Sequence, residues 1–537
     1  MIPSLQWLVA TELIGLAFLP VTLWLLGALP DRGYAFAKVL GLLLATYVTW
    51  LAGNILPVGS SNVVPTLTAL CAAGGWWVFR RSLPATLLEI RHLIAIEEAL
   101  FLAAFVGWTI VRTQVLGASI GHTEQFMDLT FLQGSLHSAT YPPYDAWMSG
   151  HGINYYYFGY LMYATLTRLS GVAASVGYNL SLSLVFALTV TSTYSVCYSL
   201  VRKIWWPLLA PLFVALIGNW HAALWEIPRC GISGTSTPDF WSWLWQSTRV
   251  VGNNFTVSDS SCAGAAHSAS NTINEYPFFS FVLGDLHPHV MALPVVLLVL
   301  ALSIGFLRSS DIARPDRNRE VSLRLLLFAV CAGSLFVINS WDFPTYLLAA
   351  AACVFARAYL DDARSTWWQP PLLTVAAMGL LSVLLYLPFY AGFKSLARGF
   401  GWVSTPTDLF EFVQVNGLWL SLSALLVVTL SFLLRPAEEE VSEDVAERTS
   451  GTLTTSSETG ASNLDTLVVA ASIMVASLFL HRAVLAILLL LGVYAASVLY
   501  RALNSEEQNG GDIAALLFVL VGLAALALTE VGYIRDV

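Results

Sequence analysis

Long apolar stretches separated by short polar segments run through the whole chain. Most are close to the roughly 20 residues that an α-helix needs to cross a bilayer. Their length and spacing predict an all-α, polytopic membrane protein with about 14 transmembrane helices. The predicted spans are 3–29, 34–56, 62–79, 92–114, 175–200, 204–224, 289–308, 323–340, 343–358, 370–391, 416–435, 464–480, 482–502 and 512–530.

The composition agrees with this pattern. Of the 537 residues, 57% are hydrophobic and only 11% are charged, and the mean hydropathy is +0.70. Such values are typical of a membrane protein. Much of the net charge of −9 lies in one acidic loop, and the 25 Lys and Arg are scattered over loops, so no nucleic-acid partner is indicated. The first residues carry no basic segment or cleavage site, so we expect a retained first helix.

Lysine and arginine in short loops predict which ends of the helices face the cytoplasm. Basic residues mark inner loops at 80–91, 202–203, 308–324 and 357–364. This orientation places four segments on the extracytoplasmic side of the cell membrane, and they are 115–174, 225–288, 339–343 and 392–415.

Residues 154–171 are long enough to be a further span. If they crossed, the basic loop 308–324 would move outside, against the positive-inside rule. The stretch also begins with three tyrosines and carries Arg168, which suits a helix lying at the membrane surface. We therefore predict an interfacial helix in the first large outer loop.

Three potential metal ligands, Asp285, His287 and His289, alternate directly before a predicted span. An extended Asp-x-His places both side chains on one face, and His289 can join them from the helical turn that Pro288 opens. Carboxylate and imidazole are usual ligands for divalent cations. The trio predicts a metal site, for Mg²⁺ or Mn²⁺ rather than Zn²⁺. The alternative is that Asp285 caps the helix and the histidines lie at lipid headgroups.

The first outer loop holds a second group of ionisable residues, which are His122, Glu124, Asp128, His137, Asp145 and His151. Asp128 precedes an apolar-patterned segment, so it is either a catalytic carboxylate or the cap of an amphipathic helix. Asp145 follows two prolines and is either a substrate ligand or a turn residue. Aromatic candidates for a substrate pocket, or for the aromatic belt of the membrane surface, are Trp147, Tyr155, Tyr156 and Tyr157.

The remaining outer segments add candidates of lower weight. Trp341 and Asp342 lie at a tight helical hairpin, where Asp342 is one more carboxylate or a helix cap. Lys394 and Arg398 are cations on the outer face; they would bind an anionic ligand or extend to lipid headgroups. Cys230 and Cys262 share one loop, and an outward-facing loop would allow them to form a disulfide.

Several of these stretches together resemble the prokaryotic YYY membrane-protein family, named for its triple tyrosine. The resemblance runs from about residue 95 to the C-terminus and is carried by five motifs, which are Met127-Asp128 with Phe131-Leu132, Pro142-Pro143-Tyr144-Asp145-Ala146-Trp147, Asn154-Tyr155-Tyr156-Tyr157-Phe158-Gly159, Gly284-Asp285-Leu286-His287-Pro288-His289 and Ser340-Trp341-Asp342-Phe343-Pro344. In that family further helices follow a segment like 530–537. The resemblance therefore implies a truncated or split member and a partner chain that completes it.

More distantly, the layout is similar to that of GT-C membrane glycosyltransferases. If 92–114 is the first core helix, Asp128 falls in the first outer loop and Asp285 in the next one. This likeness implies a GT-C-like core over 92–435 that carries the outer loops. Residues 1–91 would then be accessory helices, 436–463 an acidic cytoplasmic linker, and 464–537 the C-terminal helices.

These features predict a transferase that moves a sugar from a polyprenyl-phosphate donor to an extracytoplasmic hydroxyl acceptor. Asp128 would take the acceptor proton. A cation at Asp285, or Lys394 and Arg398 directly, would stabilise the departing phosphate. Many GT-C-like enzymes use no metal, and His287 and His289 would then bind phosphate or acceptor.

Two other functions remain open. A small-solute transporter would use the outer acidic residues as an access site, although the predicted helix centres contain almost no ionisable residues. The chain could instead be a non-catalytic subunit of a membrane assembly.

Overall fold

The computed structural model describes residues 2–58, 63–80, 83–230, 240–252, 272–309, 319–361, 367–434 and 482–535. The predicted linker 436–463, the predicted span 464–480 and Cys262, with its predicted disulfide to Cys230, lie outside the described residues.

The chain forms two compact units, and each is built from two separate stretches of sequence. The first comprises Met1–Gly218 and Tyr276–Ser395, and the second comprises Asn219–Glu275 and Leu396–Val537. Residues 1–91 therefore belong to the same compact unit as the helices that directly follow them.

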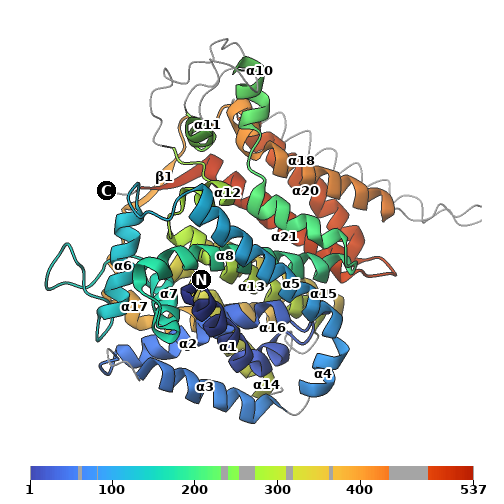
Figure 1. Cartoon of the computed structure of the whole chain (residues 1–537). Helices are drawn as coiled ribbons and strands as arrows, with labels where there is room; N and C mark the ends of the chain where they lie inside the picture. The colour runs from blue at the N-terminus through green and yellow to red at the C-terminus, as the bar shows by residue number, and fades with distance from the viewer. Residues whose placement is uncertain are drawn as a thin grey trace, which may run out of the picture. The chain divides into compact units, whose positions relative to one another are not determined.

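The first unit is the larger one and is built from helices, many of which are labelled in Figure 1. Its elements are α1 (Ile2–Leu25), η1 (Tyr34–Phe36), α2 (Ala37–Gly53), α3 (Val63–Phe79), α4 (Leu83–Glu89), α5 (Arg91–Ile110), η3 (Val111–Val115), α6 (Gln125–His137), α7 (Tyr157–Ser170), α8 (Ala174–Val201), η4 (Trp206–Leu208), α9 (Leu209–Pro211), η5 (Leu212–Leu216), α12 (Pro277–Leu283), α13 (Pro288–Arg308), α14 (Arg319–Ile338), α15 (Asp342–Asp361), α16 (Gln369–Leu384) and α17 (Leu387–Gly392).

The second unit is smaller and also mainly helical. Its elements are η6 (Ala222–Glu226), α10 (Ile227–Cys230), α11 (Phe240–Gln246), β1 (Gly399–Trp402), α18 (Leu409–Leu433), α20 (Ala483–Leu503), α21 (Gly510–Val531) and β2 (Gly532–Arg535). α20 packs against both α18 and α21. β1 and β2 pair antiparallel, with Gly399 opposite Arg535. The described residues are thus mostly helical, as predicted, with this one short strand pair as an addition.

Ten helices of the described residues are long and apolar enough to cross a membrane. They are 2–25, 34–53, 91–115, 174–201, 288–308, 320–338, 342–361, 409–433, 483–503 and 510–531. Each coincides with a predicted span, and most of the helix ends differ from the predicted ones by only a few residues. Three further predicted spans correspond to shorter apolar helices, at 63–79, 206–216 and 369–384.

Two predicted spans are wrong as continuous helices. The stretch 204–224 breaks at Ile217, whose backbone is extended, after Pro207 and Pro211 have removed two helical N–H donors. The stretch 370–391 divides between α16 and α17, and Pro388 lies in the first turn of α17. Proline disrupts a helix interior but fits a helix start, so both stretches form shorter pieces.

Helix packing in the first unit follows the order of the sequence only in part. α5 packs on α8, α8 on α13, and α13 on α15, whereas α1 packs on α2 and α3. Trp108 of α5 stacks on Phe186 of α8 with ring centroids 4.3 Å apart. Trp50 of α2 packs at 5.4 Å against Tyr386, which follows α16. Aromatic contacts of this kind stabilise the core beyond simple burial.

The helix predicted at the membrane surface lies instead inside the bundle. α7 has 14 residues, or roughly 21 Å at 1.5 Å per residue, which is too short for a span. Every residue of α7 from Tyr157 to Thr167 is buried, because α1, α2, α3, α6, α8, α13 and α14 all pack around it. The prediction that this stretch is not a span agrees with the candidate spans.

Segments predicted on the same side of the membrane contact one another in the first unit. On the outer side, Tyr156 hydrogen-bonds Ser340 at 2.8 Å, and the backbone N–H of Lys394 donates to Asn154 at 2.8 Å. On the inner side, Arg32 pairs with Glu89 at 3.3 Å. These contacts are the ones that the predicted topology requires.

Ionisable side chains also gather inside the helices of the first unit. Lys38 of α2 pairs with Glu12 of α1 at 3.2 Å and with Glu98 of α5. The neighbouring Glu97 is 1% exposed and lies against the carboxyl of Asp31, which is completely buried. Glu12 lies near the middle of α1, whereas Lys38, Glu97 and Glu98 lie in the first two turns of α2 and α5.

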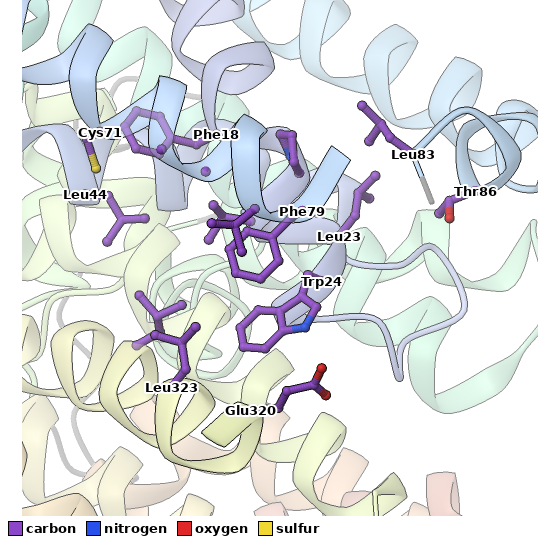
Figure 2. Close-up of a pocket in the computed structure, with 16 residues that line it drawn as sticks. Phe18, Leu23, Trp24, Leu44, Cys71, Phe79, Leu83, Thr86, Glu320 and Leu323 are labelled. Carbon is purple, nitrogen blue, oxygen red and sulfur yellow. The ribbon is translucent and has the colours of Figure 1, made fainter. Parts of the chain in front are cut away.

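A cavity of about 870 Å³ lies among α1, α3, α4 and α14 (Figure 2). Its lining is mainly apolar, and Phe18, Trp24 and Phe79 contribute aromatic rings. Glu320 is the carboxylate among its lining residues. Because the cavity brings together few polar groups, it is a poor place for catalysis.

We expect Gly333→Ala to destabilise the first unit. A Cβ atom at Gly333 would lie 2.5 Å from the carbonyl oxygen of Ser382 and 2.7 Å from the Tyr386 ring, so α14 and α16 would have to separate. The expected loss is about 1–3 kcal/mol, measured as a lower Tm of the purified protein. Gly305→Ala is the matched control, because no described atom lies within 4 Å of its Cβ position. Equal Tm values for the two variants would contradict this close approach.

Candidate functional site

Two segments far apart in the sequence meet next to the N-terminal end of α13. The hydroxyl of Thr123 donates to both carboxylate oxygens of Asp285, at 2.8 and 2.9 Å. Two residues further on, the amide of Gln125 donates to the carbonyl of Leu283 at 3.0 Å. The loop before α6 is therefore fastened to the turn that contains Asp285, and both belong to the first unit.

The turn around Asp285 is formed by a glycine and a proline. α12 ends at Gly284, which has a left-handed backbone with φ +78°, a conformation that glycine adopts at little cost. A Cβ atom there would lie 2.1 Å from Nη1 of Arg112, so the position also needs glycine for close approach. His287 is extended and caps α13, which begins at Pro288.

Asp128 lies in the first turn of α6 and is completely buried. Its Oδ1 accepts from the hydroxyl of Tyr160 at 2.6 Å, and its Oδ2 lies 3.3 Å from the hydroxyl of Tyr178. The N-cap of α6 is Glu124, so the alternative that Asp128 caps this helix is wrong. Its carboxylate instead fixes two tyrosines.

Tyr178 connects the two carboxylates of the site. Besides Asp128, its hydroxyl contacts the carbonyl of Gly284 at 3.1 Å and accepts from the backbone N–H of Leu286 at 3.1 Å. Asp285 lies between these two backbone groups in the sequence. A single phenol therefore joins α6 to the turn that positions Asp285.

Burial raises the pKa of both carboxyls toward neutrality. The pKa of Asp128 rises to about 6, because desolvation outweighs the hydrogen bond from Tyr160. The pKa of Asp285 rises to about 7, again mainly through desolvation, and the nearby Asp128 and Glu124 raise it further. A carboxyl with a pKa near neutrality can take up a proton and release it at physiological pH.

Two histidines and a glutamate form a hydrogen-bonded chain beside these carboxyls. Nε2 of His287 lies 2.8 Å from Glu124, and its Nδ1 lies 2.8 Å from Nδ1 of His289. Nε2 of His289 is 3.1 Å from the hydroxyl of Ser280. The bond from His287 lowers the pKa of Glu124. Both nitrogens of each imidazole are thus engaged, which fixes the orientation of the rings.

The predicted metal ligands do not fit a metal ion in this arrangement. Among the described residues no three His, Cys, Asp or Glu side chains form a group that could hold one. Asp285 is bound by Thr123, whereas the two histidines bind each other through Nδ1. Metal coordination needs lone pairs directed at a common point, and here these groups are directed at protein partners.

The three consecutive tyrosines face three different neighbours. The Tyr155 ring stacks on Phe131 at 5.2 Å, and its hydroxyl lies 3.5 Å from His287. Tyr156 bonds Ser340. Tyr157 is buried and accepts from the indole N–H of Trp50 at 3.0 Å. Of the three tyrosines, Tyr155 is the one that lies beside His287. Tyr157 is part of the buried core.

Two further predicted substrate ligands, Asp145 and Trp147, lie in the loop between α6 and α7. Asp145 accepts from the backbone N–H groups of Trp147 and Met148, at 2.8 and 3.0 Å, so it forms a turn. Trp147 is 63% exposed and meets Phe131 edge to face at 6.0 Å.

Among the described residues of the first unit, no hydrogen bond or ion pair joins Trp341, Asp342 or Lys394 to Asp128 or Asp285. Asp342 accepts from Asn339 at 3.0 Å, and Trp341 is 60% exposed. Lys394 is exposed and bonded through its backbone to Asn154. Arg398 is exposed as well and belongs to the second unit.

Sequence reasoning missed Thr123, Tyr160, Tyr178 and Arg112. A lone threonine or tyrosine has no distinctive spacing, so nothing marked the first three. Arg112 had a signal, because an arginine in the last turn of a predicted span is uncommon.

Asp285→Asn should change the pH dependence of stability. The pKa of Asp285 rises from an ordinary 3.8 to about 7 on folding, so its contribution favours the folded state below about pH 4 and is lost as the pH rises through 7. An asparagine at this position does not ionise, so the variant does not lose this stability as the pH rises. The Tm of the variant relative to wild type should increase by a few degrees between about pH 5 and pH 8. Asp145→Asn is the control, and an equal Tm difference at both pH values would contradict the raised pKa.

A comparison with protein families identifies the family to which the chain belongs. The model described as Uncharacterized membrane protein (DUF2298) matches residues 44–537. The match begins inside α2 and so extends further toward the N-terminus than residue 95, where the resemblance was expected to start. No curated protein and no solved structure matches the chain. Since the family model covers most of its length, the chain belongs to the membrane-protein family DUF2298.

Proposed function

We propose that this protein is a membrane glycosyltransferase that moves a sugar from a polyprenyl-phosphate donor to a hydroxyl acceptor. In this reaction the acceptor oxygen forms a bond to the anomeric carbon, and the bond from that carbon to the phosphate oxygen breaks. The acceptor proton passes to a protein carboxylate, and the bonding electrons leave with the lipid phosphate. The observation that carries the proposal is the hydroxyl-bound Asp285, whose pKa is about 7.

Asp285 is the general base in this proposal. The Thr123 hydroxyl already donates to both of its oxygens, as an acceptor hydroxyl would do before transferring its proton. Thr123 is exposed and has a positive φ of 51°, so it belongs to a surface loop that an acceptor can reach. A base with a pKa near the working pH is the most effective one.

Asp128, the residue favoured by sequence reasoning, is better suited to positioning. It has no exposed surface, and its hydrogen-bond partners Tyr160 and Tyr178 are fully buried. Asp285 is 6% exposed, and its partner Thr123 lies at the surface. An acceptor would have to displace Tyr160 or Tyr178 to reach Asp128. Through Tyr178 it orients the turn that contains Asp285.

The chain of Glu124, His287 and His289 supplies the polar surface beside the base. Side-chain exposure is 26% for His287 and 56% for Glu124, so these groups are accessible to an acceptor or to a sugar. Tyr155 and Trp147 both pack on Phe131, and such aromatic surfaces suit the apolar face of a sugar ring.

The order of the elements also supports a GT-C-like architecture. A candidate span ends at Val115, α6 and α7 follow without being spans, and α8 is the next span. Asp128 lies in the first connection, and Asp285 lies directly before α13. Fold-level likeness carries less weight than the site itself.

The test is turnover of labelled polyprenyl-phosphate sugars by the purified protein, measured as released polyprenyl phosphate. Asp285→Asn should lower turnover by about 10²–10⁴-fold, the usual contribution of a general base. Asp128→Asn should lower it less and lower the Tm as well. Asp145→Asn, at the surface turn, should retain activity. Full activity of folded Asp285→Asn would refute the role of Asp285.

A second candidate is proton-coupled solute transport, which the buried cluster around Glu97 favours. Glu97 is 1% exposed and faces the buried carboxyl of Asp31, and Lys38 pairs with Glu12 and Glu98 close by. Intramembrane ionisable groups of this kind often carry protons. In proteoliposomes loaded with a pH-sensitive dye, a transporter would lose proton flux in Glu97→Gln and keep it in Asp285→Asn. A transferase would show no flux at all.

A further inference from the structure

Arg112 is a buried cation without a matching anion. It lies in η3, the π-helical turn at the end of α5, and is 2% exposed. Its Nη2 donates to Asn179 at 2.9 Å, but its Nε finds no acceptor among the described residues. Within the same residues no carboxylate forms an ion pair with it; Asp285 attracts it only from a greater distance. A buried charge is stable only when it is paired, so this guanidinium needs an anion.

A cavity lies beside this guanidinium. It has a volume of about 460 Å³, and its lining includes Arg112, Asn179, Ser4, Ser175 and Thr113. Asn179 donates to the carbonyl of Ala118 at 3.1 Å and Thr113 to that of Thr109 at 2.8 Å. The candidate donors to phosphate oxygens are therefore the Arg112 guanidinium and the hydroxyls of Ser4 and Ser175. Leu129 and Leu180 complete the wall. A phosphate group on an apolar molecule fits this mixture of groups.

An adjoining cavity extends from the polar one along the start of α1. Its volume is about 640 Å³, and it shares Ser4, Thr109 and Thr113 with the first. Ile2 and Leu5 also line it, and they are 74% and 62% exposed. α1 and α5 are both candidate spans, so exposed apolar side chains here face the lipid. The adjoining cavity thus offers a path for a hydrocarbon chain.

We infer that these two cavities bind a lipid with a terminal phosphate, its phosphate at Arg112 and its chain along α1 and α5. The position is next to the candidate site, because the Arg112 guanidinium packs against Gly284, the residue before Asp285. Identification of this lipid as the sugar donor rests on the proposed function. The binding of a lipid phosphate itself does not.

This assignment replaces the cations that sequence reasoning proposed for the phosphate. Lys394 and Arg398 are exposed, and exposed cations are well solvated without a ligand. Arg112 is withdrawn from water and lacks a counterion among the described residues, so the gain from binding an anion is greatest there.

The experiment measures lipid binding to the full-length protein by native mass spectrometry. The probes are a polyprenyl phosphate, the uncharged polyprenol and phosphatidylglycerol. Arg112→Gln should weaken polyprenyl phosphate binding by about 10–100-fold and leave polyprenol unchanged. Arg112→Lys should retain part of the affinity, because it keeps the charge. Lys394→Gln is the control and should bind as wild type does.

A second variant tests the same site independently, in case Arg112→Gln does not fold. Thr113 is exposed and lines both cavities, so Thr113→Phe should block the path while Arg112 stays in place. Weaker binding in this variant, with an unchanged Tm, supports the site. Tighter binding of polyprenyl phosphate than of phosphatidylglycerol, whose phosphate is a diester, supports a site for a terminal phosphate, and equal binding of the two contradicts it. Unchanged binding in folded Arg112→Gln, or a loss only in Lys394→Gln, overturns the inference.

The same variants separate this inference from the proposed function. Asp285→Asn should bind polyprenyl phosphate normally and lose turnover. If Arg112→Gln loses binding while the wild type shows no turnover, the lipid site stands and the transferase does not. If Asp285→Asn loses turnover while Arg112→Gln binds normally, the transferase stands and the lipid site fails.

Discussion

The hydrogen bonds of Tyr178 hold together everything that gives the site its chemistry. One phenol contacts Asp128, the carbonyl of Gly284 and the backbone N–H of Leu286. A turn at the end of a membrane helix has polar backbone groups that must find partners. Tyr178 supplies them from α8 and at the same time joins the turn to α6. The position of Asp285 is therefore a consequence of satisfying backbone groups in an apolar setting.

The same scarcity of water shapes the electrostatics. Asp128 and Asp285 are both nearly inaccessible to solvent, so each ionised form is disfavoured and the pKa of each rises. His287 is the positive group that acts on both carboxyls, and its effect is smaller than that of desolvation. The fold thus holds two carboxyls that can exchange protons near neutral pH, and Arg112 forms no ion pair with a described carboxylate.

The membrane helices were predictable because they follow from one strong constraint. Length and apolarity located ten spans to within a few residues at most ends, and basic loops predicted which segments share a side. The same reasoning brought Asp128 and Asp285 to one region. It could not predict the burial of α7, which depends on seven neighbouring helices that no local pattern reveals. Nor could it predict the hydrogen bonds from Tyr160 and Tyr178 to Asp128, because both tyrosines are distant from Asp128 in the sequence.

Arg112 indicates a binding site because its buried charge has no ion-pair partner among the described residues. A residue 2% exposed with a permanent charge should have a partner, and the described carboxylates do not provide one as an ion pair. A purely structural arginine would be expected to use its Nε as well as Nη2, which alone bonds Asn179. The adjoining cavities contain the volume and the polar groups that a phosphate needs, next to a surface that faces lipid. The anion that completes Arg112 therefore has to arrive from the membrane side, within reach of the turn that carries Asp285.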